Sequence, residues 1–210
     1  MQKILSSFYK KLYRYFGPQH WWPAKSPFEV MVGAILTQNT SWQNVEKAIA
    51  NLKKKKALSA KKLQALKEPE LAALIKPSGF YHLKARRLKI FLEFFFSRHQ
   101  GNAKKMSAGD TYDLRNALLM VKGIGPETAD SILLYALNKP VFVVDAYTKR
   151  ILLRHKLIKA DATYGEVQNL FMRNLKNQPE LFNEYHALLV RLAKDFCSKR
   201  RPRCEECPLG

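Results

Sequence analysis

The sequence predicts an all-α fold, and three observations carry that prediction. Apolar residues recur at the three- and four-residue spacing of amphipathic helices through most of the 210 residues. Glycine and proline fall between these periodic segments, as Gly17-Pro18 does after the first one. A strand-like run occurs only at Val141–Val144, and four residues are too few to build a sheet.

The first half of the chain contains the longest series of predicted helices. Apolar spacing predicts helices over residues 2–16, 28–36, 42–52 and 63–75, and another around residues 88–95. Ser26-Pro27-Phe28-Glu29 has the form of a capping box with proline at the first helical position, which predicts where the second helix begins. Residues 99–109 are predicted to be a loop.

The central feature of the chain is the turn Gly123-Ile124-Gly125 between two predicted helices. Apolar spacing runs from Leu114 to Val121 before the turn and from Ala129 to Leu137 after it. A glycine pair lets a partner approach the backbone closely, and the N–H groups at the start of the second helix suit a phosphate. The same two glycines would also serve a plain turn between helices, so both interpretations stay open.

The lone carboxylate Asp145 follows the apolar run Val141–Val144, twenty residues after Gly125. Further helices are predicted to about residue 156 and over residues 167–175 and 185–196. Asp145 therefore precedes a helix, where it can act as an N-cap. A capping carboxylate near the positive end of a helix is expected to have a lowered pKa and to stay ionised.

Composition predicts a globular protein that binds a polyanion. The 47% hydrophobic content can fill one large or two small domains. The 37 lysines and arginines against 17 acidic residues give a formal charge of +20, which favours nucleic acid over a membrane as partner. No apolar run of about 18 residues and no export leader is present, so an intracellular location is expected.

Several segments together resemble the endonuclease III superfamily of DNA glycosylases. Residues 121–130 resemble its helix-hairpin-helix motif, and residues 143–151 resemble its catalytic aspartate motif. Leu36–Thr40, Gly79–Ala85 and a C-terminal cysteine cluster follow in the family's order, so the resemblance covers nearly the whole chain.

This resemblance implies an architecture, the HhH-GPD fold. It implies a domain over residues 25–138 that carries the hairpin, and a second domain formed by residues 1–24 and 139–210, with a DNA-binding cleft between them. The implied DNA contacts are Lys122, Gly123, Ile124, Gly125 and Thr128 of the hairpin, with Gln38 and Phe80 filling the gap left by a flipped nucleotide. A buried loop anchor is the alternative role for Phe80.

The resemblance also implies the chemistry. Asp145 is expected to stabilise positive charge at C1′ as the N-glycosidic bond breaks, or to activate the attacking water. Members that also cleave the DNA strand carry a lysine nucleophile at the position of Glu127, and a carboxylate cannot form the Schiff base. A monofunctional glycosylase without efficient lyase activity is therefore expected.

The resemblance further implies a base pocket formed by Trp21, Pro23 and Trp42. Indole rings stack on purines and attract cations, which suits an alkylated, positively charged base. The Trp-Trp-Pro and Thr-Gln-Asn-Thr patterns at residues 21–23 and 37–40 resemble the 3-methyladenine DNA glycosylases of the superfamily. Tryptophan is commonly a core residue, and Trp22 is expected to be one.

The three cysteines, Cys197, Cys204 and Cys207, are too few and too close together for a disulfide framework. Their spacing resembles three of the four ligands of the superfamily's [4Fe–4S] cluster. The fourth ligand would fall six residues after Cys207, beyond the given C-terminus at Gly210. Structural zinc, with His186 or solvent as the fourth ligand, is the alternative.

The resulting expectation is a monomeric base excision repair enzyme of the cytoplasm, associated with the nucleoid. It would bind double-stranded DNA and remove a flipped, damaged base, in particular an N-alkylated purine. A mismatch-specific adenine or thymine glycosylase of the same fold is one alternative. A non-catalytic helix-hairpin-helix DNA-binding protein, with Asp145 only a helix cap, is another.

Overall fold

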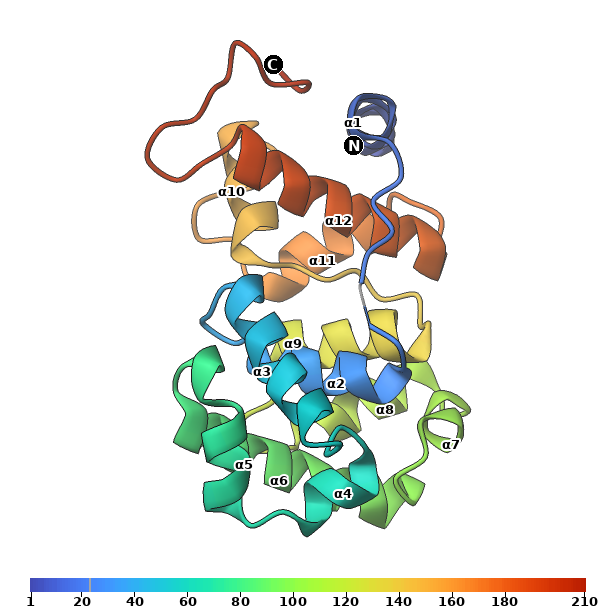
Figure 1. Ribbon diagram of the computed structural model, residues 1–210. Helices are drawn as coiled ribbons and strands as arrows, with labels where there is room; N and C mark the ends of the chain where they lie inside the picture. Colours follow the sequence, from blue (N-terminus) through green and yellow to red (C-terminus); the bar gives the residue numbers. More distant parts are fainter. Residues whose placement is uncertain (23) are drawn as a thin grey trace. The chain divides into compact units, whose positions relative to one another are not determined.

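The computed structural model describes residues 1–22 and 24–210, so Pro23 and any role predicted for it lie outside the described residues. Every element in the described part of the chain is a helix, and no β-strand occurs there (Figure 1), which confirms the all-α prediction. The backbone divides into two compact units. We call Ala24–Lys139 the hairpin unit, and Met1–Pro23 with Pro140–Gly210 the terminal unit.

The hairpin unit is built around α2. Its elements are α2 (Pro27–Leu36), α3 (Trp42–Lys54), α4 (Ala60–Ala65), α5 (Glu68–Leu74), η1 (Lys76–Ser78), α6 (Tyr81–His99), α7 (Ala103–Ser107), α8 (Thr111–Leu119), α9 (Pro126–Ser131) and η2 (Ile132–Ala136). Residues 30–36 of α2 are all buried, because α2 packs against α3, α6, α9 and the π-helical segment η2. An apolar helix with no polar face is expected at such a central position.

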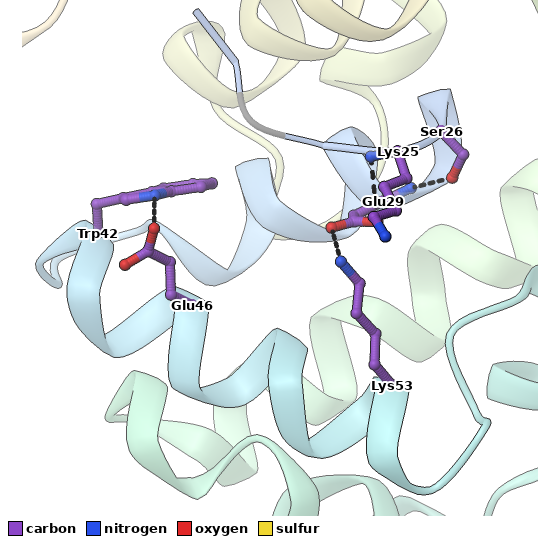
Figure 2. A network of polar contacts seen from close by, with 6 residues as sticks. All are labelled: Lys25, Ser26, Glu29, Trp42, Glu46 and Lys53. Carbon is purple, nitrogen blue, oxygen red and sulfur yellow. Dashed lines mark hydrogen bonds and ion pairs between the residues drawn. The ribbon is translucent and has the colours of Figure 1, made fainter.

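The start of α2 confirms half of the predicted capping box. Ser26 Oγ accepts a hydrogen bond from the backbone N–H of Glu29, at 3.2 Å. The Glu29 carboxylate, however, accepts from the backbone N–H of Lys25 instead of that of Ser26. Its second oxygen lies 2.6 Å from Lys53 Nζ of α3, so a buried carboxylate is paired with a cation (Figure 2).

Two predicted elements were wrong. Residues 63–75 do not form one helix, because α4 ends at Ala65 and α5 begins at Glu68. Pro69 stands in the first turn of α5, and proline is tolerated there but not in a helix interior. The predicted loop at residues 99–109 contains the short helix α7, whose first N–H groups are capped by the Asn102 side chain.

A buried lysine holds the end of α2 in place. Lys84 is 1% exposed, and its Nζ donates to the carbonyl oxygens of Leu36 at 2.8 Å and Ser78 at 2.6 Å. Burial, followed by the positive charge of Arg87, lowers the pKa of Lys84 to about 8. Lys84 therefore satisfies two carbonyl groups at helix ends that would otherwise be buried without a donor.

The terminal unit contains α1 (Gln2–Phe16), α10 (Ala146–Arg154), α11 (Tyr164–Met172) and α12 (Pro179–Asp195). The apolar run at residues 141–144 is buried and carries no regular structure. Phe142 stacks on Phe171 with ring centroids 3.7 Å apart, and the Tyr185 hydroxyl donates to the Leu5 carbonyl, which joins α12 to α1. No helix in the described residues combines the length and apolar composition needed to cross a bilayer.

The buried amine predicts how stability changes with pH. Below about pH 8 Lys84 is charged in both states and the full cost of burying its charge is present. Between about pH 8 and the ordinary value of 10.5 only the unfolded chain holds this proton, so this residue's contribution to stability rises with pH. Relative to Lys84→Met, we expect the free energy of unfolding of the wild type to rise by about 2 kcal/mol across this window. Urea titrations at several pH values measure the difference, and parallel pH profiles for the two proteins would contradict it.

Candidate functional site

Asp145 is positioned by the buried segment before it and the helix after it. Val141–Val144 are each at most 3% exposed, which fixes the backbone leading to Asp145. As the N-cap of α10, Asp145 accepts the backbone N–H of Thr148 on Oδ1, at 2.7 Å. Its other carboxylate oxygen lies 3.5 Å from His186 Nε2 of α12. The predicted N-cap role is thus confirmed, and the side chain is 14% exposed.

The surroundings of Asp145 favour its ionised form. Burial alone would raise the pKa of this carboxyl. The attraction of His186 and the hydrogen bond from Thr148 act in the opposite direction and outweigh burial, so the net pKa lies below its ordinary value. A charged carboxylate is therefore held in a site with little solvent, where its field is weakly screened.

The predicted hairpin lies between α8 and α9 of the hairpin unit. Gly123 has φ +92°, and a Cβ there would come within 2.6 Å of the Arg87 side chain, so the chain itself requires glycine at this position. A Cβ at Gly125 would meet nothing within 4 Å, so the protein's own packing does not require the second glycine. Lys122 is exposed, whereas Ile124 is 5% exposed and contributes to the core.

Gln38 joins the end of α2 to this hairpin. Its side-chain amide donates to the Gly123 carbonyl and to Thr128 Oγ1, both at 3.0 Å. Its amide oxygen accepts from the guanidinium of Arg87. Gln38 therefore fixes the hairpin from inside, and Thr128 is buried as its partner.

Phe80 differs from Gln38 in its exposure. It begins α6 in a left-handed conformation, with φ 45°, and 68% of the residue is exposed. The alternative role as a buried loop anchor is therefore wrong. A large apolar side chain presented to solvent is available for contact with another molecule.

The three tryptophans belong to different units. Trp21 and Trp22 make an edge-to-face contact in the terminal unit, with centroids 6.2 Å apart. Lys194 Nζ lies 6.0 Å from the Trp21 ring centroid. Trp42 begins α3 of the hairpin unit, is half-buried, and donates its indole N–H to Glu46 (Figure 2).

The cysteines do not fit a metal site in this arrangement. Cys197 is buried, and its Sγ lies 3.1 Å from a guanidinium nitrogen of Arg154. Cys204 is exposed and Cys207 half-buried. Among the described residues, no three His, Cys, Asp or Glu side chains are grouped so that they could share a metal ion. His186, the alternative zinc ligand, lies beside Asp145.

Sequence reasoning missed three contacts of predicted site residues. His186 and Arg87 lie far along the chain from Asp145 and Gln38, and no periodic signal joins either pair. Glu46 follows Trp42 by four residues on a predicted helix, so it could have been found from the rule that such residues face one another.

The fold and the hairpin define a class of helical proteins that contain a helix-hairpin-helix motif, and comparison with known proteins defines the family. Residues 32–177 match the model of the HhH-GPD superfamily base excision DNA repair proteins. The chain belongs to that superfamily and is a DNA glycosylase of base excision repair.

Individual relatives agree with this assignment. The chain is 48% identical, over 99% of its length, to a Methanocaldococcus jannaschii protein that carries the provisional name of a DNA repair glycosylase, and it covers 94% of that protein. It is 32% identical to the H. pylori 3-methyladenine DNA glycosylase solved with 1,N6-ethenoadenine, with a TM-score of 0.76 and coverage of 92% of this chain and 95% of that one. A trapped endonuclease III–DNA covalent intermediate shares the fold, with a TM-score of 0.85, 21% identity, and coverage of 100% of this chain and 93% of that one.

Replacing His186 tests how Asp145 is kept ionised. His186→Gln keeps a side-chain N–H but removes the titratable ring, so we expect the pKa of the Asp145 carboxyl to rise. Stability linked to this carboxyl is present above its unfolded pKa and is lost as pH falls through the lower folded value, so the variant should lose less on acidification. NMR titration of ¹³C-labelled aspartate carboxyls measures the pKa directly.

His155→Gln is the matched control, because His155 caps the other end of α10. His155→Gln should leave the pKa of the Asp145 carboxyl unchanged. An unchanged Asp145 pKa in His186→Gln would instead assign the effect to the Thr148 hydrogen bond.

Proposed function

We propose that this protein is a monofunctional DNA glycosylase that hydrolyses the N-glycosidic bond of N-alkylated purines in double-stranded DNA inside the cell, acting as a monomer on a base flipped out of the duplex. The observation that carries the proposal is the position of the Asp145 carboxylate, which contacts Thr148 and His186 at the end of a buried segment and whose pKa is lowered by these two neighbours. The family assignment supplies the general reaction.

Asp145 suits the charge that develops in this reaction. As the bond between C1′ and the base breaks, its electron pair leaves with the base and C1′ becomes cationic. A carboxylate with a lowered pKa stabilises that cation without giving up a proton. A water oxygen then bonds to C1′ and releases a proton, either to Asp145 or to solvent. The hydrogen bond from Thr148 orients the carboxylate before the substrate arrives.

The proposed substrate fits a site with one carboxylate. A purine alkylated at ring nitrogen N3 or N7 carries a positive charge in DNA and leaves as a neutral base, so protonation by a general acid is not needed. The likeness to the H. pylori 3-methyladenine DNA glycosylase supports this substrate class. The predicted roles of Trp21 and Trp42 as stacking surfaces stay predictions.

The hairpin is the proposed phosphate contact. No atom of the protein lies within 4 Å of where a Cβ of Gly125 would be. The backbone at Gly125 is therefore open to contact with another molecule. Lys122 is exposed beside it, and Gln38 and Arg87 hold the Gly123 turn in shape. Phe80 remains the proposed apolar wedge, since its ring is exposed. Gln38 would have to break its hydrogen bonds to Gly123, Thr128 and Arg87 before its side chain could enter the DNA.

The absence of a lyase step is also a proposal. Glu127 lies in the first turn of α9, where a lysine would start the covalent route. The buried amine of Lys84 is held by two carbonyl oxygens, and Lys89 Nζ donates to carbonyl oxygens at the end of α4. Two lysines with lowered pKa values are therefore engaged in holding the fold.

A [4Fe–4S] cluster held by Cys197, Cys204 and Cys207 stays a proposal that rests on their spacing. The present arrangement does not group these thiols, so no step of the reaction is derived from a cluster.

The function is tested by incubating the protein with methylated, mismatched and oxidised duplexes and identifying the freed bases. We expect release of alkylated purines and a loss of at least about a hundredfold in single-turnover rate for Asp145→Asn, because the stabilising charge is removed. Affinity for duplex DNA should stay within about threefold, since a hydrogen-bonding cap is retained. Release of mismatched bases alone would favour the mismatch glycosylase. A wild type without any base release would identify a DNA-binding protein.

Borohydride reduction tests the missing lyase step. The wild-type protein should form no covalent adduct with damaged duplex, because a Schiff base needs an amine at the sugar. Glu127→Lys places an amine at that position and is expected to give an adduct on denaturing gels. A wild-type adduct in comparable yield would contradict the monofunctional assignment.

A further inference from the structure

Trp42 and Glu46 form a contact that the family assignment does not explain. Both lie on α3, four residues apart, so their side chains share one face of the helix. The indole N–H of Trp42 donates to Glu46 Oε1 at 2.9 Å (Figure 2). The contact fixes the orientation of a half-buried aromatic ring.

The charge of Glu46 is not neutralised by an ion pair within the described residues. Figure 2 shows the contrast with Glu29 on the neighbouring helix, whose carboxylate lies 2.6 Å from Lys53 Nζ. Glu46 is exposed, and its contact is the neutral N–H of an indole. A negative charge therefore stays at the edge of the Trp42 ring.

This charge changes what the ring attracts. The face of an indole is already negative and attracts cations. A carboxylate that accepts the indole N–H increases the electron density of the ring and adds its own field a few ångströms away. Both effects stabilise the binding of a positively charged base next to Trp42. They stabilise the binding of a neutral base of the same shape only a little.

The net charge of the protein makes such a local carboxylate useful. A formal charge of +20 attracts the phosphates of DNA but disfavours a cationic base. Discrimination between a cationic and a neutral purine therefore needs a negative group close to the base. Glu46 is such a group beside an aromatic ring of the hairpin unit.

We propose that Glu46 is a specificity-determining positioning residue, which acts through Trp42 to favour cationic, N-alkylated purines over neutral bases. This inference rests on the proposed function and on a stacking role for Trp42.

The experiment compares Glu46→Gln with the wild-type protein on two duplexes. One contains 7-methylguanine, which is cationic in DNA, and the other contains 1,N6-ethenoadenine, which is neutral. Glutamine can still accept the indole N–H, so the variant removes the charge and keeps the ring in place. We expect the single-turnover release of 7-methylguanine to fall by about threefold to tenfold. Release of ethenoadenine should change by less than about twofold.

Two controls separate this effect from general ones. Glu93→Gln removes the same charge from an exposed position on α6 of the same unit, and should leave both rates unchanged. In a Trp42→Phe background, Glu46→Gln should lower the 7-methylguanine rate clearly less than in the wild-type background, because phenylalanine has no N–H to donate to the carboxylate and only the direct field of the charge remains.

Three results would overturn the proposal. Equal 7-methylguanine rates for Glu46→Gln and wild type would show that the charge is unimportant, and a parallel fall for both bases would assign Glu46 a structural role. A full effect in the Trp42→Phe background would show that Glu46 does not act through the indole. None of these three results contradicts the proposed function. A wild-type protein that releases no alkylated purine would contradict both the proposed function and the proposal for Glu46.

Discussion

The charge of Asp145 is the constraint on which the terminal unit depends. A carboxylate with 14% of its side chain exposed stays ionised only if nearby groups stabilise the charge. Thr148 does so from the first turn of α10, and His186 does so from α12. The buried residues 141–144 set the position of the backbone before Asp145. The same packing that stabilises the unit therefore also holds the charged carboxylate in place.

The hairpin unit uses part of its positive charge to hold itself together. Lys84 and Lys89 donate to carbonyl oxygens at helix ends, Lys53 pairs with the buried Glu29, and Arg87 binds Gln38. These cations satisfy polar groups that a helical core would otherwise leave without partners.

Two acidic residues carry the proposals on reaction type and specificity. Glu127 places a carboxylate where the covalent route would require an amine. Glu46 places another carboxylate at the edge of an aromatic ring. Glu127 lies in the first turn of α9, where an acidic side chain is favourable, whereas Glu46 lies beyond the first turn of α3.

The sequence by itself determined the helical fold, the hairpin between α8 and α9, and the capping position of Asp145, because these follow from local spacing and from glycine and proline chemistry. Local rules also explain the two errors. Pro69 lies in the first turn of α5, which divides a predicted helix, and Asn102 caps α7, a helix that was not predicted. Only the tertiary structure brought His186 to Asp145 and Arg87 to Gln38, and only it exposed Phe80. These contacts join residues distant in the chain, and their energies come from burial and charge, which periodicity does not encode.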